Sequence, residues 1–167
     1  MAEINLNPDS VILAESTLSH EGEEELNPAI LSDNTTDTGF VFSESNGFFV
    51  VSVDNPAQNI DSTITIKVFI TSMGVKGSVT TDIAFDPEGP FTNVDGFDGQ
   101  ASDETRTISK TLTSAQLSNI NNLIIRVGSN VPDVLIGEVT VIATTVAGGQ
   151  IILFEGLLAI TQGEITI

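Results

Sequence analysis

The side chains best suited to metal chemistry form one acidic stretch in the middle of the chain. Its carboxylates belong to Asp95, Asp98 and Asp103, and the first two each precede a glycine. Calcium binds six to eight oxygen atoms, which closely spaced carboxylates and carbonyls supply. The spacing departs from the D-x-[DN]-x-[DN]-G calcium loop, and Asp-Gly pairs also form turns. These three residues are therefore candidate calcium ligands, and the simpler interpretation is an acidic loop.

Little else in the sequence could catalyse a reaction. The chain has no cysteine and one histidine, His20, which lies beside a run of glutamates. A zinc site or a nucleophile–histidine pair needs more of these residues than the chain has. Two carboxylates could act as acid and base on a sugar, but such a site also needs groups that position the substrate, usually aromatic ones. The chain has no tryptophan or tyrosine. We therefore predict a protein that is not an enzyme and binds no cofactor.

The net charge of −18 restricts the partners of the chain. Nucleic acids require clustered lysine and arginine to neutralise phosphates, and an anionic membrane surface makes the same demand. The sequence has no apolar run of the ~18 residues that a membrane helix needs. Its N-terminus also lacks the pattern of a signal peptide. We expect no nucleic-acid partner, no membrane partner, and synthesis in the cytoplasm without export.

Turn-forming pairs recur at short intervals and separate runs rich in Val, Ile, Thr and Phe. In residues 63–70, apolar and polar side chains alternate, which is typical of a strand with one buried face. Residues 78–85 and 122–127 repeat this alternation, which places Thr80, Asp82 and Arg126 on outward faces. Further strands are expected at residues 11–16, 39–43, 48–53, 106–112 and 138–146. This pattern predicts an all-β, antiparallel two-sheet β-sandwich of the jelly-roll kind.

Two local patterns refine this fold. Thr113 and Gln116 fit a capping box, in which each side chain hydrogen-bonds to the backbone of the other. The box predicts one short helical turn near residues 114–120. In residues 106–112, Arg106 and Lys110 share a face with apolar residues. Charge at such positions is typical of an edge strand, where it blocks aggregation.

The nine phenylalanines are the only aromatic residues. Because tryptophan and tyrosine are common anchors of sugar-binding surfaces, their absence argues against a stacking carbohydrate site. Phe91 and Phe97 are expected in a loop, where they either cap the end of the sandwich or insert into a partner. The phenylalanines predicted to form the core are Phe40, Phe42, Phe48, Phe49, Phe69 and Phe85.

The chain reads as a single domain over residues 1–167, with an acidic loop at 20–37 and an apolar extension at 148–167. Strands in this extension would be apolar on both faces, which indicates burial on both sides. Self-association as a dimer or trimer would hide the second face. The alternative is a final pair of strands that covers the core. The candidate partner interface consists of Ile151, Ile152, Leu153, Phe154, Leu157, Leu158 and Ile160.

Several segments resemble a group of jelly-roll proteins encoded in the structural regions of tailed bacteriophages. They are INLNPDSVI, NPAILSDNTTDTGFV, TITIKVFI, TLTSAQLSNINNLIIRV and EVTVIATT, within residues 3–146. The resemblance implies a small sandwich displayed on a virion as head decoration, cement or a tail-associated module. It carries over no catalytic residue. The acidic insert at 21–25 and the apolar extension depart from the pattern of the group.

The predicted function is therefore that of a non-enzymatic structural protein of a virus particle. It would be a capsid decoration, cement or knob-type protein, located in the virion and bound to other virion proteins, including the capsid protein. The alternative is a tail-associated jelly-roll module that binds a receptor or a carbohydrate through the loops at one end of the sandwich.

Substitutions can distinguish the two faces of the apolar extension. Ile152 and Phe154 share one strand face, while Ile151 and Leu153 share the other. Burial of such a side chain contributes about 1.5–3 kcal/mol. Aspartate on the partner face should disrupt assembly of a folded domain, whereas aspartate on the core face should unfold it. Light scattering and circular dichroism of the four single variants measure both effects. Identical behaviour of all four would contradict an assembly role.

Overall fold

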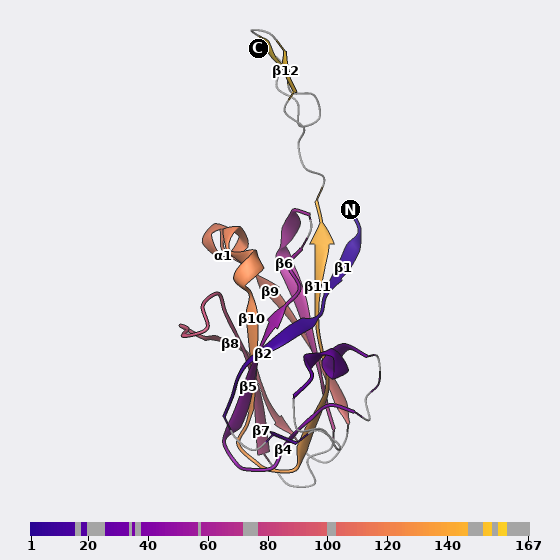
Figure 1. Cartoon of the computed structure of the whole chain (residues 1–167), viewed down its shortest axis with the longest axis vertical. Helices are drawn as coiled ribbons and strands as arrows, with labels where there is room; N and C mark the ends of the chain where they lie inside the picture. The colour runs from indigo at the N-terminus through magenta and orange to yellow at the C-terminus, as the bar shows by residue number, and fades with distance from the viewer. Residues whose placement is uncertain are drawn as a thin grey trace.

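The chain folds into two antiparallel β-sheets that pack face to face (Figure 1). The computed structural model describes residues 1–15, 18–19, 26–33, 35, 38–56, 58–71, 77–99, 103–146, 152–154 and 157–159. The acidic run at 21–25 lies outside these residues. No helix in this part of the chain is long and apolar enough to cross a membrane.

One sheet has six strands and the other has five. The six-stranded sheet runs in the order β3-β4-β11-β6-β9, with β1 also paired to β11. Its strands are β1 (Glu3–Leu6), β3 (Leu18–Ser19), β4 (Phe40–Phe42), β6 (Ile60–Ile70), β9 (Glu104–Thr111) and β11 (Val134–Thr145). The five-stranded sheet runs β2-β5-β10-β7-β8. Its strands are β2 (Pro8–Glu15), β5 (Gly47–Val53), β7 (Gly77–Ala84), β8 (Thr92–Gly99) and β10 (Ile124–Ser129). The predicted two-sheet sandwich is confirmed.

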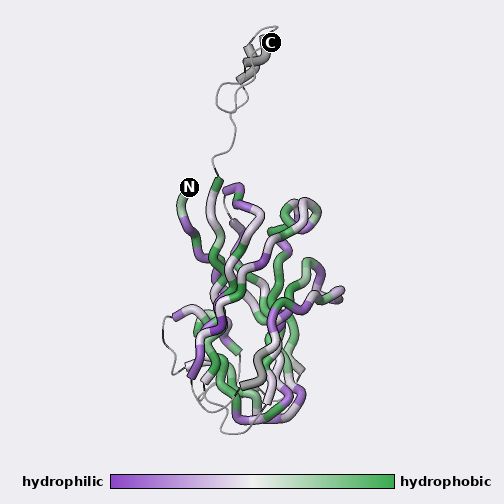
Figure 2. The backbone as a smooth tube through the Cα atoms, turned by 180° about the vertical axis from the view of Figure 1, so that it is seen from behind, coloured by the Kyte–Doolittle hydropathy of each residue, from purple (hydrophilic) through white to green (hydrophobic). Residues whose placement is uncertain are grey.

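The core fills the space between the inner faces of the two sheets. Alternate residues of the strands are buried, and these apolar positions run through the body of the sandwich (Figure 2). An aromatic trio joins the sheets, because Phe49 of β5 packs edge-on against Phe40 of β4, with ring centroids 5.0 Å apart. Phe49 also stacks on Phe42, with centroids 5.9 Å apart. Aromatic pairs of this kind stabilise a fold by more than the burial of their surface area alone would contribute.

Three of the phenylalanines predicted to form the core are only half-buried: Phe48, Phe69 and Phe85. Phe48 and Phe49 are adjacent in β5, so they must point to opposite faces of the sheet. Phe69 likewise alternates with the buried Val68 and Ile70 in β6. The core prediction was therefore wrong for Phe48 and Phe69, and Phe85 packs only partly against the core.

The short helical turn forms where the capping box predicted it. The helix α1 spans Ser114–Ser118, and Thr113 accepts a hydrogen bond from the backbone N–H of Gln116. A 3₁₀ turn, η2 (Ile120–Asn122), then leads to β10. A second 3₁₀ turn, η1 (Pro28–Ser32), lies in the expected acidic loop and buries Leu31 completely. Asn27 caps η1 through its side chain. Asparagine followed by proline is a helix-start signal, because the asparagine side chain accepts from a free backbone N–H and proline has none to satisfy.

The strands β8 and β9 form the edges of the two sheets on the same side of the sandwich, and an ion pair connects them. Arg106 of β9 donates to both oxygens of Asp95 of β8, from Nε at 2.8 Å and from Nη2 at 3.0 Å. Its Nη1 donates to Glu104 at 2.9 Å. Hydrogen bonds to Asp95 and then Glu104 raise the pKa of Arg106 above its usual value. The predicted edge position of this strand is confirmed.

The second segment predicted as an acidic loop, which contains Asp95 and Asp98, is largely the strand β8. Its backbone pairs with β7 from Gly99 to Thr92, with one register shift between Thr81 and Asp82. Glycine and aspartate disfavour strands, but pairing with a neighbouring strand overrides this weak local preference. The loop prediction was wrong for this reason.

The apolar extension contains two strands that pair with each other. They are β12 (Ile152–Phe154) and β13 (Leu157–Ala159), and Leu153 lies opposite Leu158. Within the described pairings this two-stranded sheet is separate from the sandwich sheets. Ile151 and Ile160 lie outside the described residues. The proposed role of the extension in self-association stays a prediction.

The aromatic trio gives a direct test of the packing. Phe49→Ala should lower the free energy of unfolding by about 3–5 kcal/mol, because it leaves a cavity between the sheets. Phe69→Ala removes the same atoms from the half-exposed outer face of β6, and a cost of about 1 kcal/mol is expected. Urea unfolding of both variants measures the difference. Equal losses would contradict the assignment of Phe49 to the inter-sheet core.

Candidate functional site

The outer face of the five-stranded sheet carries the polar residues that its inner face excludes. In the central strand β10, Ile125 and Val127 are buried in the core, so Arg126 and Gly128 face outward. Strand register fixes the neighbours of these two residues. Arg126 lies beside Asp82 of β7, and Gly128 lies between Phe48 of β5 and Thr80 of β7.

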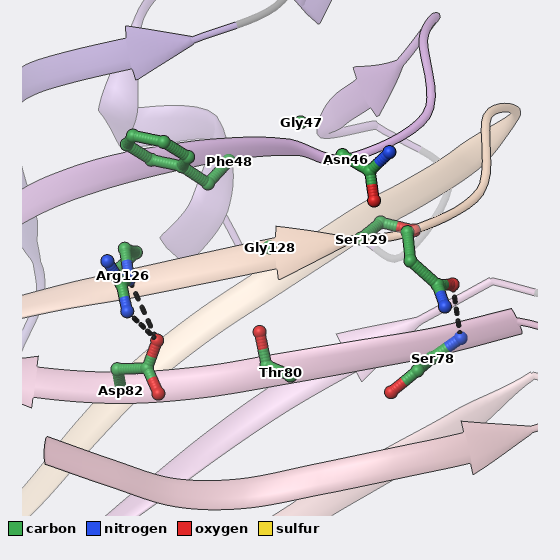
Figure 3. A pocket seen from close by; sticks show the side chains of 10 residues that line it. Asn46, Gly47, Phe48, Ser78, Thr80, Asp82, Arg126, Gly128 and Ser129 are labelled. Atoms are coloured by element: carbon green, nitrogen blue, oxygen red, sulfur yellow. Dashed lines mark hydrogen bonds and ion pairs between the residues drawn. The ribbon is translucent and has the colours of Figure 1, made fainter.

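A groove of about 330 Å³ crosses this face, within the range of about 300–1,000 Å³ that is typical of small-molecule sites (Figure 3). Gly128 forms part of its floor. A Cβ atom at Gly128 would lie 3.3 Å from Thr80 Oγ1 and 3.4 Å from the carbonyl oxygen of Gly47, so the missing side chain keeps the groove open. The lining residues are Asn46, Gly47, Phe48, Ser78, Thr80, Asp82, Arg126, Gly128, Ser129 and Asn130.

One wall of the groove is formed by Arg126 and Asp82, and Asn93, which does not line the groove, completes their hydrogen-bonded network. Arg126 contacts Asp82 Oδ2 from Nε at 2.8 Å and from Nη2 at 2.7 Å. The other oxygen, Oδ1, accepts a bond from Nδ2 of Asn93 at 2.8 Å. The side chain of Asp82 is only 7% exposed, so these partners offset the cost of burying its charge. The network fixes the guanidinium in one orientation.

The same guanidinium lies over two aromatic rings. The Cζ atom of Arg126 lies 4.2 Å from the ring centre of Phe91 and 5.7 Å from that of Phe48. Both rings also cover a small apolar cluster on this outer face, which consists of Val50, Ala84 and Ile124. Cation–π contacts of this kind strengthen when water is excluded. The groove thus combines an aromatic surface with an immobilised polar wall.

The opposite end of the groove offers further hydrogen-bonding groups. Asn130 accepts a bond from the backbone N–H of Ser78 at 2.7 Å through Oδ1, which orients its amide. Ser129 donates to the carbonyl of Val131 at 2.8 Å. Asn46 has a φ of 61°, a left-handed conformation that asparagine tolerates better than most residues. Across the described residues, the Thr80 hydroxyl makes no hydrogen bond within the protein.

The structure describes the side chains of two of the three calcium candidates from the sequence, Asp95 and Asp103, and the calcium site stays a prediction. Asp95 is held by Arg106 at the side of the sandwich, and Asp103 is exposed just before β9. The backbone of Asp98 belongs to β8, and its side chain lies outside what the structure describes. In the described ranges, no three acidic or histidine side chains come close enough to share a metal ion.

Sequence reasoning placed the groove residues Thr80, Asp82 and Arg126 on outward faces, and the structure brings them together. Sequence reasoning did not identify Phe48, which was assigned to the core, or Gly128 as groove residues. It also expected binding at the loops of one end, whereas the groove lies on a sheet face. The available signal was the alternation of β5, which requires either Phe48 or Phe49 to point outward.

No family model and no curated protein matches the chain. Among solved structures, it is similar to a carbohydrate binding module (CBM6cm-2) from Cellvibrio mixtus lichenase 5A in complex with cellotriose. The identity is 12% and the TM-score 0.49, over 86% of this chain and 98% of that one.

A xylan-binding module, CBM15, is 13% identical with a TM-score of 0.47, over 87% of this chain and 99% of that one. A CBM4 structure is 12% identical with a TM-score of 0.31, over 74% and 97%. At these values the likeness assigns no ligand to this chain. The virion role stays a prediction, because these matches do not test it.

Proposed function

We propose that this chain is a non-enzymatic module that binds carbohydrate in the groove on the outer face of its five-stranded sheet. The observation that carries the proposal is the wall formed by Arg126 and Asp82, which a hydrogen bond from Asn93 supports, beside the ring of Phe48. Sugars present hydroxyl groups at their edges and apolar C–H groups on their faces. A groove with fixed polar groups next to an aromatic ring matches both.

A sugar hydroxyl both donates and accepts hydrogen bonds, and the polar groups of the groove can pair with it in both roles. Arg126 donates, the Thr80 and Ser78 hydroxyls donate or accept, and the amides of Asn46 and Asn130 do both. Several of these groups are already oriented by bonds within the protein. Pre-orientation lowers the entropy cost of binding. Phenylalanine lacks the polar tip of tyrosine and tryptophan but presents a comparable apolar face.

The groove follows a row of residues across three strands, Phe48, Gly128 and Thr80, and Gly96 of the edge strand β8 continues this row beyond the lining residues. Neighbouring strands lie about 4.8 Å apart, so the row spans about 14 Å from Phe48 of β5 to Gly96 of β8. A Cβ atom at Gly96 would meet no atom within 4 Å, so the row is open at the edge strand β8. This geometry favours a segment of a linear chain over a single terminal sugar.

The arrangement of carboxylates supports binding without catalysis. Hydrolysis of a glycosidic bond needs two carboxyl groups that flank it. Asp82 is the only carboxylate among the lining residues, and its oxygens are occupied by Arg126 and Asn93. A carboxylate held in this way is not available as an acid, base or nucleophile.

Two substitutions in the groove test the proposal. Gly128→Val should abolish binding, because its side chain fills the floor. Thr80→Val removes one hydroxyl without changing the volume, and a loss of about 1 kcal/mol, or roughly fivefold in affinity, is expected. Affinity electrophoresis in gels that contain β-glucan, xylan or mannan identifies the ligand, and titration calorimetry then measures its affinity.

Thr65→Val is the matched control, because Thr65 occupies an outward position of β6 in the other sheet. It should leave binding unchanged. The proposal is wrong if no polysaccharide retards the protein, or if folded Gly128→Val binds as the unsubstituted chain does.

A further inference from the structure

The groove contains one cation, and its charge is already balanced. Arg126 is 33% exposed in its side chain and is paired with Asp82 in the groove wall. The second arginine, Arg106, is paired at the side of the sandwich. Lys67 and Lys110 belong to the six-stranded sheet, and Lys76 lies outside the described residues. Around these few bases the chain carries a net charge of −18.

The pairing also limits how Arg126 can meet a ligand. Two of its nitrogens, Nε and Nη2, are directed at Asp82. Its guanidinium carbon also lies over the rings of Phe91 and Phe48. An anionic ligand that took both of these nitrogens would leave the buried carboxylate of Asp82 without its charge partner, which is costly. A neutral hydroxyl can accept from Nη1 and leave the pair intact.

We infer that the groove selects neutral polysaccharides over those that carry uronate or sulfate groups, and that Asp82 sets this selectivity by cancelling the charge of Arg126. The inference rests on the proposed function and goes beyond it by naming the ligand class. Asp82 acts as a positioning residue, since it affects the ligand by orienting Arg126 and neutralising its charge. The negative net charge adds a repulsion that salt screens over about 8 Å.

The test compares neutral and acidic polymers in the same assay. The unsubstituted chain should be retarded by at least one of β-glucan, xylan and mannan, and by neither polygalacturonate nor alginate at low salt. Asp82→Asn keeps the size of the side chain but leaves Arg126 with an uncompensated charge. This variant should gain about tenfold or more in affinity for polygalacturonate, because the guanidinium can then form charge-assisted bonds. High salt should remove the gain.

Asp61→Asn is the control for net charge. Asp61 is exposed on β6, in the other sheet, and its substitution changes the total charge by the same amount. It should leave both affinities as they are. A gain in Asp61→Asn equal to that in Asp82→Asn would overturn the inference, since the effect would then come from net charge alone.

Other outcomes separate the two proposals. Equal or tighter binding of polygalacturonate by the unsubstituted chain overturns the selectivity and leaves carbohydrate binding in place. A folded Asp82→Asn variant without a gain overturns the role of Asp82. If Asp82→Asn does not fold, the comparison of polymers on the unsubstituted chain still decides the selectivity. If no polymer of either kind binds, the proposed function fails together with the inference.

Discussion

Burial of the inner faces of the two sheets determines the rest of the structure. Strand side chains alternate, so a register error of one residue would move every core residue of a strand to the surface. The trio of Phe40, Phe42 and Phe49 makes such an error costly, because three large rings would lose their packing. The same register places Arg126 beside Asp82 and Gly128 beside Thr80. The groove is therefore a consequence of how the core packs.

The outer face has its own stabilisation, separate from the main core. Val50, Ala84 and Ile124 form a small apolar cluster under Phe48 and Phe91. The charge of Asp82 lies next to this cluster, where an unpaired carboxylate would be unfavourable. Arg126 and Asn93 supply its partners. Packing and polar groups thus support each other at the groove.

Local patterns in the sequence predicted local structure well. The capping box of Thr113 and Gln116 involves residues three apart, and it formed as expected. Alternation likewise predicted that Asp82 and Arg126 point outward. Their contact could not be predicted, because it depends on pairing between β7 and β10, which are 44 residues apart at this point. The strand β8 was missed for the same reason, since its pairing partner outweighs its glycines and aspartates.

The row across the outer face of the five-stranded sheet contains two glycines, Gly128 and Gly96, which differ in the space available for a side chain. At Gly128 a side chain would crowd Thr80 and Gly47, whereas at Gly96 nothing lies within 4 Å of the position of a Cβ atom. Glycine inside a strand costs roughly 0.5–1 kcal/mol relative to alanine, because it loses more backbone freedom on folding. Sterically, almost any residue could occupy position 96. Replacement of Gly96 by a residue that favours strands would thus raise the free energy of unfolding, and it would place a side chain at the outer edge of the sheet, beside the residues that line the groove.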